Sequence, residues 1–162
     1  MSGTNLKTVI AASVTTLVMS LSGISNAAVP DPLHIVGDYK CTGFDSHDGT
    51  FNGDLTFTLD EKASHFEKSF GAYTFKLIVE LGGEKATYSG YAAAQGQLLS
   101  MFFANDSVEA PTDRGTGIAV ITHDQDSAGK YTTTLHKSYY LPGYKGGGRG
   151  TESCIKTSTQ SS

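Results

Sequence analysis

Apolar and polar residues alternate in short runs along most of the chain. Between Asp54 and Leu59 each Asp or Thr is followed by Leu or Phe, and Tyr73–Leu81 repeats this two-residue period. Such alternation predicts strands with one buried and one solvated face. About eight runs, each ending at a Gly, Asp, Asn or Ser cluster, have the spacing of sandwiches and barrels. The predicted strands are Ile35–Phe44, Phe51–Leu59, Tyr73–Leu81, Ala86–Ala94, Leu98–Ala104, Gly117–His123, Lys130–Tyr140 and Gly150–Lys156.

The connections between these runs predict how the strands are arranged. Most are too short for a parallel crossover, which needs about a dozen residues or more, so neighbouring strands are antiparallel. After residue 27 no long window has helical periodicity, and Asp60–Ser69 reads as a loop or a short helical turn. Sequential hairpins form a meander that closes naturally into a barrel. We therefore predict an all-β fold, a single antiparallel up-and-down barrel of about eight strands.

The two cysteines fit a closed barrel. Cys41 lies in the first predicted strand and Cys154 in the last. Closure makes those strands neighbours, so the sulfurs come within reach of a disulfide, whereas an open sheet would hold them at opposite edges. We predict a Cys41–Cys154 disulfide that closes the barrel. The alternative is that each cysteine is a small buried apolar residue.

The N-terminal segment has the pattern of a secretory signal peptide. Met1–Lys7 carries a positive charge, Val9–Ile24 is uncharged and largely apolar, and the small residues Ser25 and Ala27 suit a cleavage site. The expected organisation is a signal peptide (1–27), a barrel domain (28–156) and a flexible C-terminal tail (157–162). The mature protein is expected to be secreted or periplasmic, without stable membrane insertion.

Composition and charge exclude one class of partner. The chain has a net charge of −4, which becomes −5 once Lys7 is removed with the leader, and it contains no run of Lys or Arg. Binding to a phosphate backbone needs such positive charge, so nucleic acid is not an expected partner.

Motifs for catalysis and metal binding are missing from the sequence. The five His and two Cys lack zinc-ligand spacing, and Asp45–Gly49 and Asp124–Gly129 resemble calcium loops without the closing acidic residue. The glycine-rich stretch Gly143–Gly150 precedes a strand, whereas a phosphate cradle precedes a helix. The acidic residues are expected in turns and at outward strand positions, so no pair faces a cleft. We predict a non-enzymatic protein with no catalytic residue, cofactor or metal.

Two kinds of binding site are compatible with this barrel. The surplus of apolar positions assigned to the interior favours a small apolar or amphipathic ligand between the strands. A solid core is the alternative. The proposed ligand contacts are Phe57, Phe75, Leu77, Met101 and Phe103, within a wider inward set that also includes Leu55, Val79, Leu99, Ile118 and Val120.

The second candidate site is the last connection. Tyr144, Lys145 and Arg149 bring aromatic and cationic groups together, as in protein interfaces. This hypothesis describes a loop-mediated inhibitor or adhesion module that acts on an extracytoplasmic protein such as a lysozyme or protease. In the alternative interpretation, Tyr139 and Tyr140 cover opposite faces of a strand and Arg149 plugs the barrel end.

Two families share features with this sequence. Gly37-Asp-Tyr39 together with Arg149 resembles the Gly-x-Trp motif and closing Arg of lipocalin-like (calycin) barrels, with Tyr in place of Trp. That resemblance implies a small apolar ligand inside the barrel. The signal peptide, the Tyr39-x-Cys41 start and the late Cys154 are similar in layout to small exported lysozyme or protease inhibitors, which are also eight-stranded barrels.

Overall fold

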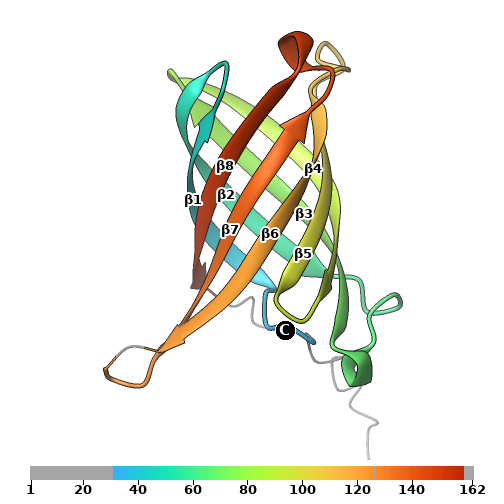
Figure 1. Cartoon of the computed structure of the whole chain (residues 1–162), viewed down its shortest axis with the longest axis vertical. Helices are drawn as coiled ribbons and strands as arrows, with labels where there is room; N and C mark the ends of the chain where they lie inside the picture. The colour runs from blue at the N-terminus through green and yellow to red at the C-terminus, as the bar shows by residue number, and fades with distance from the viewer. Residues whose placement is uncertain (1–30, 126, 159–162) are drawn as a thin grey trace, which may run out of the picture.

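The protein is a closed barrel of antiparallel strands (Figure 1). The computed structural model describes residues 31–125 and 127–158, so the predicted signal peptide and residues 159–162 lie outside the described part. The predicted all-β up-and-down barrel is confirmed. Its strands are β1 (Gly37–Asp45), β2 (Gly49–Leu59), β3 (Phe70–Leu81), β4 (Glu84–Gln95), β5 (Leu98–Asn105), β6 (Arg114–Gln125), β7 (Tyr131–Leu141) and β8 (Gly148–Ser158).

Each strand pairs with the next, and β8 returns to pair with β1. In that seam Cys41 lies directly opposite Cys154, and their sulfurs are 2.08 Å apart. The predicted disulfide is therefore confirmed. It crosslinks two strands that are 113 residues apart in sequence.

The strand boundaries differ from the predicted ones by a few residues. β6 begins at Arg114 and β8 ends at Ser158, so the predicted C-terminal tail starts inside the last strand. Between β2 and β3 lies a single 3₁₀ turn, η1 (Phe66–Lys68), and η2 (Tyr144–Gly146) lies between β7 and β8. No helix within residues 31–125 and 127–158 has the length and apolar character needed to cross a membrane.

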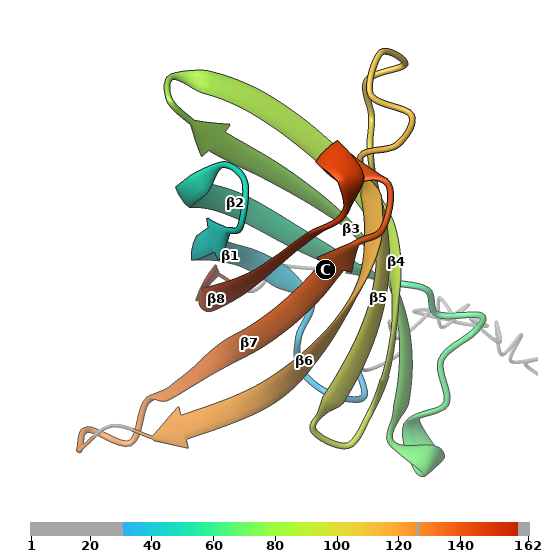
Figure 2. The same ribbon diagram turned by 45° about the horizontal axis from the view of Figure 1, so that its top comes forward.

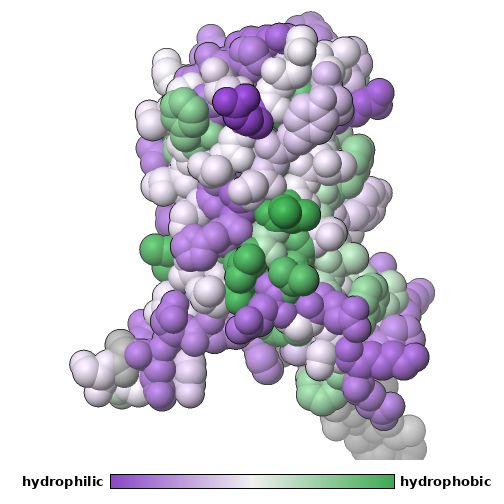
Figure 3. All heavy atoms as spheres, viewed as in Figure 1, coloured by the Kyte–Doolittle hydropathy of each residue, from purple (hydrophilic) through white to green (hydrophobic). Residues whose placement is uncertain are grey.

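Two residues predicted to face inward face outward. Ile118 is 70 % exposed and Val120 is also exposed, whereas their neighbours Ala119 and Ile121 are buried. The sequence of β6 is apolar on both faces here, so alternation does not identify the inner one. The strand register identifies the outer face of β6, because Val120 pairs with Leu98 of β5, which is itself exposed. Ile118, Val120 and Leu98 form part of an apolar patch on the outside of the barrel (Figure 3).

Aromatic side chains fill the barrel core. The ring of Phe57 packs against those of Tyr39, Tyr73 and Phe75, with centroids 5.5 to 6.1 Å apart. Glycine makes room for these rings on neighbouring strands. A Cβ atom at Gly90 would lie 2.6 Å from Phe75 Cζ and would also collide with the Phe102 carbonyl oxygen. The backbones of two strands therefore approach each other closely at Gly90.

One end of the barrel is plugged by residues 31–36, which precede β1. Ile35 is 0 % exposed. Tyr39 Oη donates a hydrogen bond of 2.6 Å to the Ile35 carbonyl, and Lys156 Nζ donates one of 2.7 Å to the His34 carbonyl. Asp31 accepts bonds from the Val36 amide and from a tyrosine hydroxyl on β3. These bonds tie the plug to β1, β3 and β8.

Candidate functional site

The opposite end of the barrel opens into a cavity of about 420 Å³. This is the upper end in Figure 1, which Figure 2 turns toward the viewer. Segments 46–48, 82–83, 106–113 and 142–147 connect the strands there. The apolar part of the wall includes Leu77, Val79, Leu81, Phe103 and Leu141.

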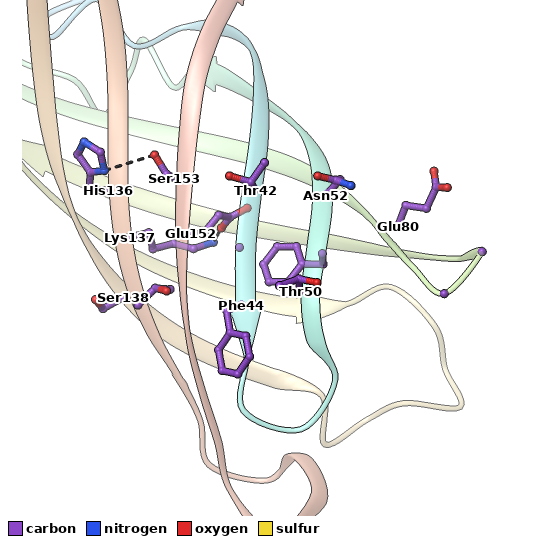
Figure 4. A pocket seen from close by; sticks show the side chains of 15 residues that line it. Thr42, Phe44, Thr50, Asn52, Glu80, His136, Lys137, Ser138, Glu152 and Ser153 are labelled. Carbon is purple, nitrogen blue, oxygen red and sulfur yellow. Dashed lines mark hydrogen bonds and ion pairs between the residues drawn. The ribbon is translucent and has the colours of Figure 1, made fainter.

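A buried ion pair lies in this wall. Lys137 of β7 and Glu152 of β8 are opposite each other in register, and their side chains are only 6 % and 0 % exposed. Figure 4 shows the two side chains meeting, while His136 and Ser153, one position along, bond to each other on the other face. Lys137 Nζ also lies 5.4 Å from the ring centroid of Phe103.

Glu152 corrects the expectation that acidic residues occupy only turns and outward strand positions. The inward orientation of Glu152 could have been predicted from the sequence, because residues two positions apart on a strand lie on the same face. Cys154 must face inward to form the seam disulfide with Cys41, so residue 152 faces inward too. The same argument applies to Lys137, which lies between the inward residues Leu135 and Tyr139.

A second carboxylate ends β1 at the rim of the cavity. Asp45 is buried, and its Oδ2 accepts a 3.0 Å hydrogen bond from the Tyr139 hydroxyl. Its Oδ1 accepts a 2.8 Å bond from the His47 amide within the turn at residues 46–48. Burial, together with the charge of Asp45, raises the pKa of Tyr139. Tyr139 is the donor in this bond, and the raised pKa keeps its proton in place even above the pH at which a free tyrosine ionises.

A third carboxylate comes from the connection between β5 and β6. Asp113 is only 5 % exposed. Its Oδ2 accepts 2.8 Å hydrogen bonds from the Tyr88 hydroxyl and from Asn105 Nδ2. Among the described residues, its buried Oδ1 has no hydrogen-bond partner, and the same is true of Glu152 Oε1. Glu152 Oε2 also lacks a hydrogen bond but is ion-paired with Lys137, so two buried acceptor atoms in the cavity wall have neither a hydrogen bond nor an ion pair.

A set of contacts, here called the clasp, joins two connections across the mouth. Asp48 accepts a 2.5 Å bond from Lys145 Nζ and a 2.8 Å bond from the Tyr144 hydroxyl. His47 Nε2 lies 2.8 Å from the Gly147 carbonyl oxygen. Partial burial opposes ionisation of Asp48, but the bonds from Lys145 and Tyr144 prevail and lower its pKa.

The proposed ligand contacts fall into two groups. Leu77 and Phe103 line the cavity. Phe57, Phe75 and Met101 also face inward, but they belong to the packed core and do not line this cavity. The interior is therefore solid along part of its length and hollow at one end.

The residues proposed for partner binding are also separated. Tyr144 and Lys145 belong to the clasp. Arg149 lies on β8 beside Tyr140 of β7, and both side chains are exposed. Tyr139 and Tyr140 do cover opposite faces of β7, but Arg149 does not plug the barrel.

The proposed counterpart of the lipocalin closing arginine is likewise displaced. Tyr39 lies at the plugged end, whereas Arg149 lies at the open end of the same sheet. The residue paired with Tyr39 across the seam is Lys156, which bonds to the plug.

One group of side chains in the described residues has the composition of a metal site. Cys41, Cys154 and Glu152 bring their potential ligand atoms within 4.8 Å of one another. Both sulfurs are in the disulfide, so neither can supply a thiolate, and Glu152 is paired with Lys137. These residues therefore do not make a metal centre while the disulfide is intact.

A larger hollow of about 800 Å³ lies across β1 and is more open to solvent than the cavity. Hydroxyl and amide side chains on the outer face, such as Thr42 and Asn52, form much of its border (Figure 4).

Comparison of the chain with protein-family models, with curated proteins and with solved structures finds no match. A functional interpretation therefore rests on the geometry of the barrel itself.

Proposed function

We propose that this protein is a non-enzymatic binding barrel that holds a small amphipathic ligand in the cavity at its open end. The supporting observation is the difference between the two ends, one plugged by residues 31–36 and the other hollow. The cavity volume of about 420 Å³ lies within the range of about 300–1,000 Å³ that is common for small-molecule sites.

The composition of the wall supports an amphipathic ligand over a purely apolar one. Leu77, Val79 and Phe103 offer apolar surface, against which a ligand would lose water contact. Asp45, Asp113 and a set of tyrosine hydroxyls, which lie in the same cavity, would orient a polar group.

A fluorescent titration tests this proposal. N-phenyl-1-naphthylamine, a neutral amphipathic dye, is added to the oxidised protein, and bound dye is expected to gain fluorescence. Val79→Trp places an indole in the cavity and should weaken binding at least tenfold. Ile78→Trp is the matched control, because Ile78 lies on the same strand and is exposed on the outer face. The control should bind like the wild type.

The titration has two outcomes that contradict the proposal. One is no dye binding by a wild-type protein that is folded according to circular dichroism. The other is unchanged binding by a folded Val79→Trp variant.

A loop-mediated inhibitor is the second candidate function. It is supported by exposed side chains at the open end: Lys145 in the connection between β7 and β8, and Tyr140 and Arg149 on the strand ends beside it. Tyrosine and arginine are enriched among the residues that dominate protein interfaces. We expect the protein to inhibit a lysozyme or a protease in an activity assay. The double variant Tyr140→Ala/Arg149→Ala should lose this inhibition while its affinity for the dye is unchanged.

A further inference from the structure

The charges in the cavity wall are unequal. Five acidic residues and three lysines line it. Two lysines are already paired, Lys137 with Glu152 and Lys145 with Asp48. Asp45 and Asp113 form no ion pair within the part of the chain that the structure describes. The third lysine, Lys85, is exposed and forms no ion pair with either of them among the described residues, so the eight charged residues of the wall leave an excess of two negative charges.

Two carboxylate oxygens in the cavity wall mark where a ligand could donate hydrogen bonds. Tyr88 and Asn105 fix Asp113 Oδ2, so the buried Oδ1 is the atom that still needs a donor. The second such atom, Glu152 Oε1, lies in the wall of the same cavity. A buried acceptor without a partner is unfavourable, so a ligand that donates hydrogen bonds to it gains affinity.

The aromatic residues around these carboxylates can also accommodate a cation. The Phe103 ring packs edge-on against both Tyr88 and Tyr139, with centroids 6.1 and 5.8 Å away. Lys137 Nζ already lies 5.4 Å from the centroids of Phe103 and Tyr139. An ammonium group is attracted to the faces of such rings.

We propose that the ligand is an organic ammonium ion with a small apolar body, whose charged head lies beside Asp113 and the ring of Tyr88, away from the Phe103 and Tyr139 rings next to Lys137. This inference rests on the proposed function. An ammonium head supplies both the missing positive charge and several N–H donors. A carboxylate head would face unpaired acidic groups, and an alcohol would supply one donor without charge.

Three probes with one apolar chain and different heads test the inference on the wild-type protein. Octylammonium, octanol and octanoate each compete with N-phenyl-1-naphthylamine at pH 7. Octylammonium is expected to displace the dye at a concentration at least tenfold lower than octanol, and octanoate should be the weakest. Equal displacement by octylammonium and octanol overturns the inference, as does stronger displacement by octanoate.

Asp113→Asn provides an independent measurement, since Asn keeps the size of the side chain but removes its charge. The variant should lose about tenfold in octylammonium affinity and keep its affinity for octanol. Asp106→Asn is the matched control, because Asp106 lies in the same connection but is exposed and does not line the cavity. An Asp113→Asn protein that binds octylammonium like the wild type contradicts the inference.

The failure of the inference and that of the proposed function are distinguishable. If the dye binds in the cavity but octylammonium has no advantage, the function stands and the ammonium ligand is rejected. If neither the dye nor any octyl probe binds, both are rejected.

Discussion

Glycine residues at inward strand positions are matched to large aromatic rings on adjacent strands. The Phe51 ring occupies the space where Gly43 would carry a Cβ, and the Tyr139 ring does the same at Gly150. A side chain at Gly43 or Gly150 would force these rings to move, because its Cβ would lie 2.3 Å from Phe51 Cζ or 2.2 Å from Tyr139 Oη. The glycine content of the chain, which composition alone assigns to turns and bends, is thus partly a packing requirement.

We predict that Gly90→Ala destabilises the protein by about 2–3 kcal/mol, the upper part of the range of about 1–3 kcal/mol that is typical of overpacking. The added methyl group would meet both Phe75 and the Phe102 carbonyl. Gly117→Ala is the matched control, since its Cβ would have contacts of 3.3 Å or more. Urea unfolding measures both variants. Equal losses at the two positions would show that close backbone approach is not the cause.

At the scale of elements, the clasp joins the β1–β2 turn to the β7–β8 connection. Its central residue, Asp48, has a pKa below the ordinary value of 3.8. The folded state therefore holds the proton less tightly than the unfolded state. The stabilisation is complete above the ordinary pKa and is lost as pH falls through the lowered pKa of the folded state.

We predict that Lys145→Met raises the pKa of Asp48 toward or above its ordinary value, because partial burial then acts with one hydrogen bond fewer to oppose it. A carbon-13 NMR titration of the aspartate carboxyl groups measures this pKa. Lys85→Met is the control, because Lys85 also lines the cavity and has no bond to Asp48 among the described contacts. A pKa of Asp48 that does not move in Lys145→Met contradicts the clasp geometry.

Most of the architecture could be predicted from the sequence because it depends on local patterns. Alternation located the strands, short connections made them antiparallel, and the positions of Cys41 and Cys154 indicated closure. β6 was misread at Ile118 and Val120 because an apolar run on both faces has no detectable period. Their orientation depends on pairing with β5, which is a tertiary property.

The cavity was less predictable than the fold. Leu77 and Phe103 were placed correctly by alternation, but alternation does not tell how far along the barrel axis a side chain lies. The plug was hidden because Ile35 and Val36 continue the apolar pattern of the first strand. The chain departs from the strand at Gly37, whose φ of +133° is accessible mainly to glycine.

At the scale of the whole molecule, the barrel has one end that supplies stability and one that supplies the proposed site. The plug residues Leu33 and Ile35 belong to the same buried cluster as the aromatic core, whereas the open end combines a hollow with buried charges. Substitutions at the two ends should therefore affect different measurable properties.

We predict that Ile35→Ala lowers the free energy of unfolding by about 3 kcal/mol, as expected for truncating a fully buried side chain. Dye affinity should stay within twofold of the wild type, because Ile35 does not line the cavity. Urea unfolding and dye titration, both at a temperature where the variant is folded, provide the measurements. A large loss of affinity in folded Ile35→Ala would place the ligand at the plugged end.

The seam between β1 and β8 also has a consequence for the order of folding. Seven of the eight strand pairings join neighbours in sequence, and only the seam joins residues more than a hundred positions apart. Pairings of such high contact order form slowly because the intervening chain must first be confined. In the reduced chain, barrel closure waits for this encounter. Once Cys41 and Cys154 are linked, the two end strands are held together before the hairpins form, and closure is no longer the slow step.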